Sequence, residues 1–103
     1  MSVIAFRMKL RPGCQDEYQR RHADIWPELV ALLSASGISD YRIFLDESTH
    51  MLFAIQTVAG ESSQALGQTE IVQRWWAHMA DLMDVNADYS PVSVPLREVF
   101  HMT

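Results

Sequence analysis

The chain has 103 residues, a length typical of one domain, and a net charge of −5 at neutral pH. It has no basic stripe, so nucleic acid and anionic membranes are not expected partners. The single cysteine, Cys14, excludes an internal disulfide and any site built from several thiolates. No apolar run approaches the roughly 20 residues that a membrane span needs, and charges come too early for a signal peptide. We therefore expect one domain, 1–103, in a cytoplasmic setting.

The first half of the chain has the pattern of a strand followed by a broken helix. Residues 3–11 alternate apolar and mostly basic side chains, which predicts a half-buried strand that Pro12-Gly13 ends. A polar helix is predicted over residues 14–23. Pro27 is tolerable only in the first turn of a second helical segment, because proline lacks the N–H that a helix interior uses. This second segment is expected to end near Gly37.

The second half is predicted to contain a β-hairpin, a helix and a final strand. A continuous apolar run favours a central position in the sheet for the second hairpin strand, and the short connection favours antiparallel pairing. The predicted elements are strand 41–46, turn 47–49, strand 51–58, a loop or weak helix at 60–68, a helix from 69 to about 83, a loop at 86–95 and a strand at 96–102.

This order of elements predicts an α+β fold. Strand, broken helix, strand, strand, helix, strand is the split βαβ, ferredoxin-like arrangement, in which one antiparallel sheet carries its helices on one face. A chain this short has no second helical layer for the other face. A second copy is the simplest cover, so we expect a homodimer whose sheets face each other or form a dimeric α+β barrel.

Several side chains capable of chemistry lie close together between Tyr18 and Pro27. Tyr18 and His22 are four residues apart, so a helix places them on one face. The pKa of histidine makes His22 a natural proton carrier near neutral pH. An exposed histidine stabilised by the helix dipole is the simpler interpretation of the same position, and Arg20 and Arg21 have the pattern of a solvated face. None of the histidines has metal-site spacing, so we expect no metal.

Three further aromatic residues are candidates for ligand binding. Adjacent helical residues point about 100° apart, so we expect one of Trp75 and Trp76 in the core and the other at the edge of a cavity or interface. Flat aromatic faces bind the C–H faces of sugars and exclude water. Tyr41 begins a strand, where its hydroxyl reaches either a ligand or water. The residues alone leave a packing role and a binding role open for all three.

Several blocks of the sequence closely resemble the L-rhamnose mutarotase family, and together they cover nearly the full length of the chain. They are Glu-Tyr-Gln-Arg-Arg-His at 17–22, Ile-Trp-Pro-Glu-Leu at 25–29, Gln-Arg-Trp-Trp at 73–76, and Asn-Ala-Asp-Tyr-Ser-Pro-Val-Ser at 86–93, which leads to Glu-Val-Phe at 98–100.

The resemblance implies an isomerase of rhamnose metabolism that interconverts the α and β anomers of L-rhamnose as a cytoplasmic homodimer. By matching position, His22 takes the family's proton-donor role. Tyr18, Tyr41, Trp75 and Trp76 take its substrate-binding positions. Opening and closing a hemiacetal ring breaks and re-forms one C–O bond with proton transfers and without a change of oxidation state, so we expect no cofactor and no metal.

Two other functions stay open beside this one. A cofactor-free monooxygenase of the dimeric α+β barrel type would place a histidine and tryptophans around an aromatic substrate. A binding module without catalysis would hold a sugar or a hydrophobic ligand in the same cavity. One fold hosts many functions, so the fold cannot decide among them. Exchange of sugar anomers distinguishes the mutarotase from both.

Overall fold

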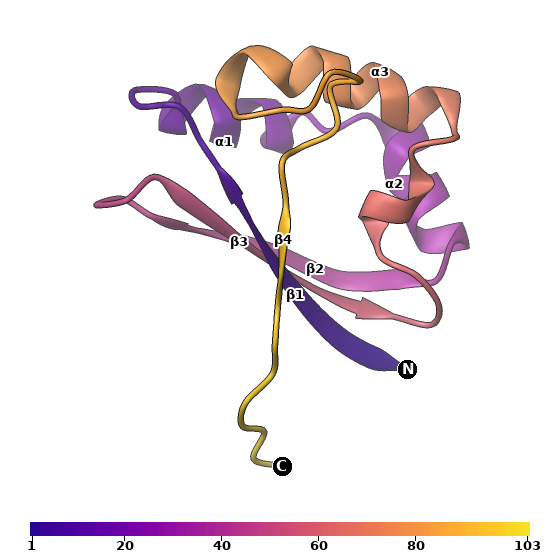
Figure 1. The fold of residues 1–103 in the computed structure, drawn as a ribbon. Coiled ribbons are helices and arrows are strands. Elements are labelled where there is room, and N and C mark those ends of the chain that lie inside the picture. Colours follow the sequence, from indigo (N-terminus) through magenta and orange to yellow (C-terminus); the bar gives the residue numbers. More distant parts are fainter.

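The computed structural model describes residues 1–103, which form one antiparallel sheet with helices on one face (Figure 1). The strand order is β2-β3-β1-β4. The α+β class and the predicted order of elements are confirmed. The elements are β1 (Ser2–Lys9), α1 (Gln15–Ala23), α2 (Pro27–Ala35), β2 (Ile38–Asp46), β3 (Met51–Val58), the 3-10 helix η1 (Ser63–Leu66), α3 (Glu70–Met79), the 3-10 helix η2 (Ala80–Leu82) and β4 (Val94–Leu96).

The break between α1 and α2 follows from proline chemistry. Trp26 has extended backbone angles, φ −65° and ψ 130°, and Pro27 is the first residue of α2. Proline disfavours helical angles in the residue before it and is tolerated at the first helical position. The predicted broken helix is confirmed. Its consequence is that the last turn of α1, which carries His22, ends beside the sheet instead of continuing past it.

The sheet has β3 at its centre, as predicted, paired with β2 on one side and β1 on the other. The pairing with β2 shifts register between Ser39 and Arg42, which is a β-bulge. Asp40, inside the bulge, has a positive φ of 46°. Bulges often re-aim side chains near functional sites, and here the bulge contains Tyr41.

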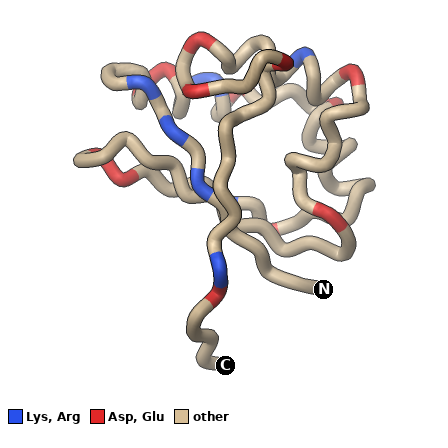
Figure 2. The backbone as a smooth tube through the Cα atoms, in the orientation of Figure 1, with Lys and Arg blue, Asp and Glu red and all other residues tan.

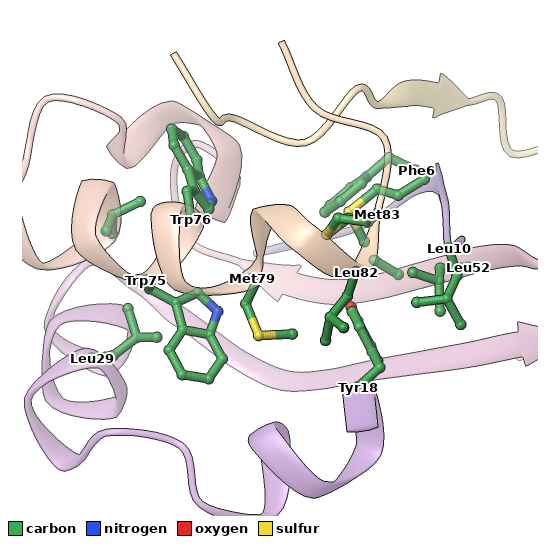
Figure 3. Packing of buried hydrophobic residues seen from close by; sticks show 13 residues of the cluster. Phe6, Leu10, Tyr18, Leu29, Leu52, Trp75, Trp76, Met79, Leu82 and Met83 are labelled. Atoms are coloured by element: carbon green, nitrogen blue, oxygen red, sulfur yellow. The ribbon is translucent and has the colours of Figure 1, made fainter. Parts of the chain in front are cut away.

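The two faces of the sheet have different environments. Along β3, buried residues alternate with half-buried ones, and the buried ones face the helices. Leu52 and Ala54 join a core cluster that also contains Trp75, Trp76 and Met79 of α3 (Figure 3). The other face carries apolar side chains that no helix covers: Val3 is 60% exposed and Phe44 is 54% exposed.

The predicted last strand, 96–102, is wrong in its bounds. The structure has β4 at Val94–Leu96, where it pairs with Ala5, Phe6 and Arg7 of β1. The segment after Leu96 forms no strand and leaves the sheet (Figure 1). Its apolar residues Phe100 and Met102 are 78% and 79% exposed. The alternation in this segment is real, but nothing in one copy of the chain lies beside it to complete a strand.

Candidate active site

A cavity of about 930 Å³ lies between the helix-facing side of the sheet and the helices. Most of its lining is apolar. All five residues singled out from the sequence line it, although they come from α1, β2 and α3: Tyr18, His22, Tyr41, Trp75 and Trp76. The fold therefore brings together side chains that are up to 58 positions apart in the sequence.

His22 is held by the backbone of its own helix. Its Nδ1 lies 3.1 Å from the carbonyl oxygen of Tyr18, so in the neutral ring Nδ1–H donates and Nε2 keeps its lone pair. The imidazole packs 4.5 Å from the Tyr18 ring and edge-on to Trp75 at 5.4 Å between centroids. Burial lowers the pKa of His22, and the hydrogen bond to the Tyr18 carbonyl partly opposes this. The simpler interpretation, an exposed helix-end histidine, is wrong, because the ring is half-buried.

The two tyrosines are both neutral hydrogen-bonding groups. Tyr18 is buried, and burial raises the pKa of its phenol well above the usual range. Burial also raises the pKa of Tyr41, while hydrogen bonds from Ser63 and Gln56 oppose the shift. Both hydroxyls therefore keep their protons near neutral pH and can donate to, or accept from, a polar ligand.

Trp75 and Trp76 leave α3 in different directions (Figure 3). Trp75 points toward α1 and α2, where it meets Trp26 edge-on at 5.1 Å between centroids. Trp76 lies against Gly67, just after η1. The expectation that only one of the pair is in the core is wrong: both are 8% exposed, and both reach the cavity.

Arg21 fastens α1, the helix of His22, to the end of α3. Its guanidinium donates to Glu17 at 2.7 Å, to Asp81 at 2.8 Å and to the carbonyl oxygen of His78 at 2.6 Å. These contacts lower the pKa of the Asp81 carboxyl. The solvated-face interpretation holds for Arg20, whose side chain is 62% exposed, but not for Arg21, which is 15% exposed.

Several polar residues at the cavity were not found from the sequence, among them three from β2, β3 and η1. Asp40 and Ser63 line it, and Gln56 is completely buried beside it. The available signal was weak: Gln56 is a polar residue inside the otherwise apolar run of β3, and the bulge at Asp40 has no marker in the sequence. No group of three or more His, Cys, Asp or Glu side chains is arranged to hold a metal ion. None of the helices is long and apolar enough to cross a bilayer.

Fold and site together define a small α+β protein of the ferredoxin-like type, with a half-buried histidine in an aromatic-lined cavity of the size of a small-molecule site. A sequence model described as L-rhamnose mutarotase matches residues 3–102. Similar proteins named L-rhamnose mutarotase occur in Bacteroides thetaiotaomicron, at 63% identity, and Phocaeicola vulgatus, at 57%, each with 99% of both chains covered.

A crystal structure of L-rhamnose mutarotase from Formosa agariphila superposes on this chain with a TM-score of 0.94, at 50% identity and with 100% of both chains covered. The chain belongs to the L-rhamnose mutarotase family, which is a family of isomerases.

Proposed function

We propose that this chain interconverts the α and β anomers of L-rhamnopyranose by opening and closing the hemiacetal ring, with His22 as the proton carrier. Tyr18, Tyr41, Trp75 and Trp76 bind the sugar. The observation that carries the proposal is the state of His22: Nδ1 is engaged by a backbone carbonyl, which leaves Nε2 for proton transfer in an aromatic-lined cavity. Family membership supplies the substrate.

The proton movements can be written with His22 alone. Because burial lowers its pKa, the resting ring is neutral at neutral pH. Nε2 takes the proton from the anomeric hydroxyl, the C1–O1 bond becomes a carbonyl, and the bond from C1 to the ring oxygen breaks. The imidazolium then donates its proton to the ring oxygen. Rotation about the C1–C2 bond and the reverse steps close the other anomer.

One nitrogen can serve both oxygens because the anomeric oxygen and the ring oxygen are bonded to the same carbon. The net change in each half-reaction is one proton moved from one oxygen to the other. A positioned acid–base residue typically contributes roughly 10²–10⁴-fold to such a step. The neutral phenols of Tyr18 and Tyr41 bind sugar oxygens without a change of charge.

The tryptophans account for the choice of a deoxy sugar in this proposal. Trp75 and Trp76 give the cavity a flat apolar wall. L-Rhamnose carries a C6 methyl group, which such a wall accommodates at no cost in desolvation. A fully hydroxylated hexose would place a hydroxyl against the same surface, and burying a hydroxyl without a partner is unfavourable.

We also propose that the chain is one domain that works as a homodimer in the cytoplasm. The uncovered face of the sheet supports the dimer, since Val3, Phe44, Val94 and Leu96 on that face are all exposed. Exposed apolar residues gathered on one sheet face fit an interface. Charges of both signs are spread over the molecule (Figure 2), and the net charge is −5, which argues against a nucleic-acid partner. A single cysteine suits a reducing compartment.

The experiment that tests the function is saturation-transfer NMR on L-rhamnose, which measures the rate of exchange between the two anomers. The wild type is compared with His22→Ala and with a histidine control, His50→Asn. His50 lies in the hairpin turn with a φ of 62°, which asparagine tolerates, and it does not line the cavity. We expect His22→Ala to lose at least about 100-fold and His50→Asn to match the wild type. A folded wild type that does not accelerate exchange would refute the function.

A further inference from the structure

Trp75 lies between two aromatic rings that each meet it at nearly a right angle. Its indole makes an interplanar angle of 87° with the imidazole of His22 and of 83° with the indole of Trp26, at centroid distances of 5.4 Å and 5.1 Å. Edge-to-face contacts at such distances are favourable for aromatic rings. A rotation of the Trp75 ring out of its plane would disturb both contacts, so its two neighbours together fix the orientation of a ring that lines the cavity.

The two neighbours of Trp75 differ in their relation to the cavity. His22 lines it, whereas Trp26 does not. The other ring that contacts Trp26 is His78, at 5.5 Å between centroids, and His78 does not line the cavity either. The guanidinium carbon of Arg74 lies 5.7 Å from the centre of the Trp26 ring, within the range of a cation–π contact. Among the rings that Trp26 contacts, only Trp75 therefore connects it to the cavity.

The backbone of Trp26 is held at the point where α1 gives way to α2. Pro27 disfavours helical angles in the residue before it, and Trp26 accordingly has extended angles, φ −65° and ψ 130°. Its carbonyl oxygen accepts hydrogen bonds from the N–H groups of Leu29, at 3.0 Å, and Val30, at 3.2 Å. The Trp26 indole thus extends from a fixed point of the chain, which makes it a suitable support for a neighbouring ring.

We propose that Trp26 is a positioning residue, which acts through Trp75 and holds the Trp75 indole in the plane from which it contacts both His22 and the sugar. This proposal rests on the proposed function, because it explains how one of the sugar-binding rings is kept in place beside the proton carrier. Loss of the Trp26 ring leaves Trp75 with one perpendicular neighbour instead of two. The indole can then adopt other orientations, which disturbs the wall against the sugar and the packing of His22.

The first test compares two replacements of Trp26 with a matched change elsewhere in the core. Trp26→Leu keeps apolar bulk but removes the ring, and Trp26→Phe keeps a ring. Phe6→Leu makes the same aromatic-to-leucine change in β1, well apart from Trp75 (Figure 3) and outside the cavity lining. We expect Trp26→Leu to lose about two- to tenfold in kcat/KM for L-rhamnose anomer exchange, the size of one aromatic pair. Trp26→Phe should lose less, and Phe6→Leu should keep full activity.

Two further measurements show whether Trp26 acts through Trp75. In a double-mutant cycle, Trp26→Leu combined with Trp75→Leu should lose about as much as Trp75→Leu alone, because Trp26 then has no ring to orient. The signals of the His22 ring in proton–carbon NMR spectra need only single variants: they should shift in Trp26→Leu and stay in place in Phe6→Leu. Trp26→Met, whose flexible side chain fills irregular core space, replaces Trp26→Leu if the leucine variant does not fold.

The outcomes distinguish the two proposals. A wild type without anomer exchange overturns the proposed function, and this inference with it. An active wild type whose Trp26→Leu variant is equally active, or whose losses multiply in the double variant, overturns only the role of Trp26. Equal losses in Trp26→Leu and Phe6→Leu do the same, because they assign the effect to general loosening of the core. So does a His22 ring whose signals do not respond to the loss of the Trp26 ring.

Discussion

Replacing Gly67 with alanine should disturb the cavity by moving Trp76. A Cβ built at Gly67 would lie 2.9 Å from Cζ3 and 3.0 Å from Cη2 of the Trp76 indole. The backbone there, with φ −64° and ψ −8°, suits any residue, so the only obstacle is space. Overpacking lowers the free energy of unfolding by about 1–3 kcal/mol. A Gly→Ala change raises it by about 0.4–1 kcal/mol, because alanine restricts the unfolded chain. The difference spans about 0–2.6 kcal/mol, and the midpoints of the two ranges give a net loss of about 1.3 kcal/mol.

The assay combines stability with binding, and Gly60→Ala is its matched control. No atom lies within 4 Å of a Cβ at Gly60, so that variant should be as stable as the wild type or slightly more stable. Gly67→Ala should lower the melting temperature by roughly 4–8 °C per kcal/mol lost, change the near-ultraviolet circular dichroism of the tryptophans, and raise KM for L-rhamnose. Equal stability and equal KM in the two alanine variants would refute the reasoning.

Three further predictions follow from the site and the sheet. With neutral His22 as the active form and its pKa lowered by burial, the rate of anomer exchange should stay level around neutral pH and fall only at a more acidic pH than an ordinary histidine would give, because acid protonates the base. A rate that rises on acidification would mean that the resting imidazolium is the donor. Arg21→Leu should lower the free energy of unfolding, measured by urea denaturation, by about 1–2 kcal/mol, chiefly through the lost charged hydrogen bond to the His78 carbonyl. Arg20→Leu should leave it unchanged. Equal urea midpoints for the two variants would contradict the role of Arg21 in fastening α1 to the end of α3. Phe44→Glu should place a charge on the uncovered sheet face and yield monomers in sedimentation velocity, and a persisting dimer would exclude that face as the interface.

Local chemistry explains which parts of the fold could be predicted from the sequence. The break at Pro27 depends on one missing N–H and was predicted, as was the hairpin of β2 and β3 from its short turn and its apolar pattern. The end of the chain was not, because the alternation at 96–102 describes a strand without saying which strand lies beside it. Only Val94–Leu96 has a partner, in β1.

The site was only partly predictable, for a related reason. The positions of Tyr18 and His22 on one helix face follow from spacing alone. Tyr41, Trp75 and Trp76 were candidates from their residue types, and the resemblance favoured a binding role over a packing role for them. Gln56 escaped notice because nothing in an apolar run indicates that Ser63, seven positions further along, supplies both hydrogen-bond partners of its buried amide. Arg21 was interpreted as part of a solvated face because its partners, Asp81 and the His78 carbonyl, lie 57 or more positions further along the chain.

The group that holds the imidazole of His22 is a main-chain carbonyl, that of Tyr18. A point substitution can delete a side-chain partner, but it leaves a peptide carbonyl in place as long as the helix persists. Point substitutions therefore do not remove the acceptor that holds Nδ1 of His22. The tyrosines and tryptophans around it have no such protection. Under the proposed function, variation among relatives can therefore alter which sugar is bound while proton transfer by His22 is inherited unchanged.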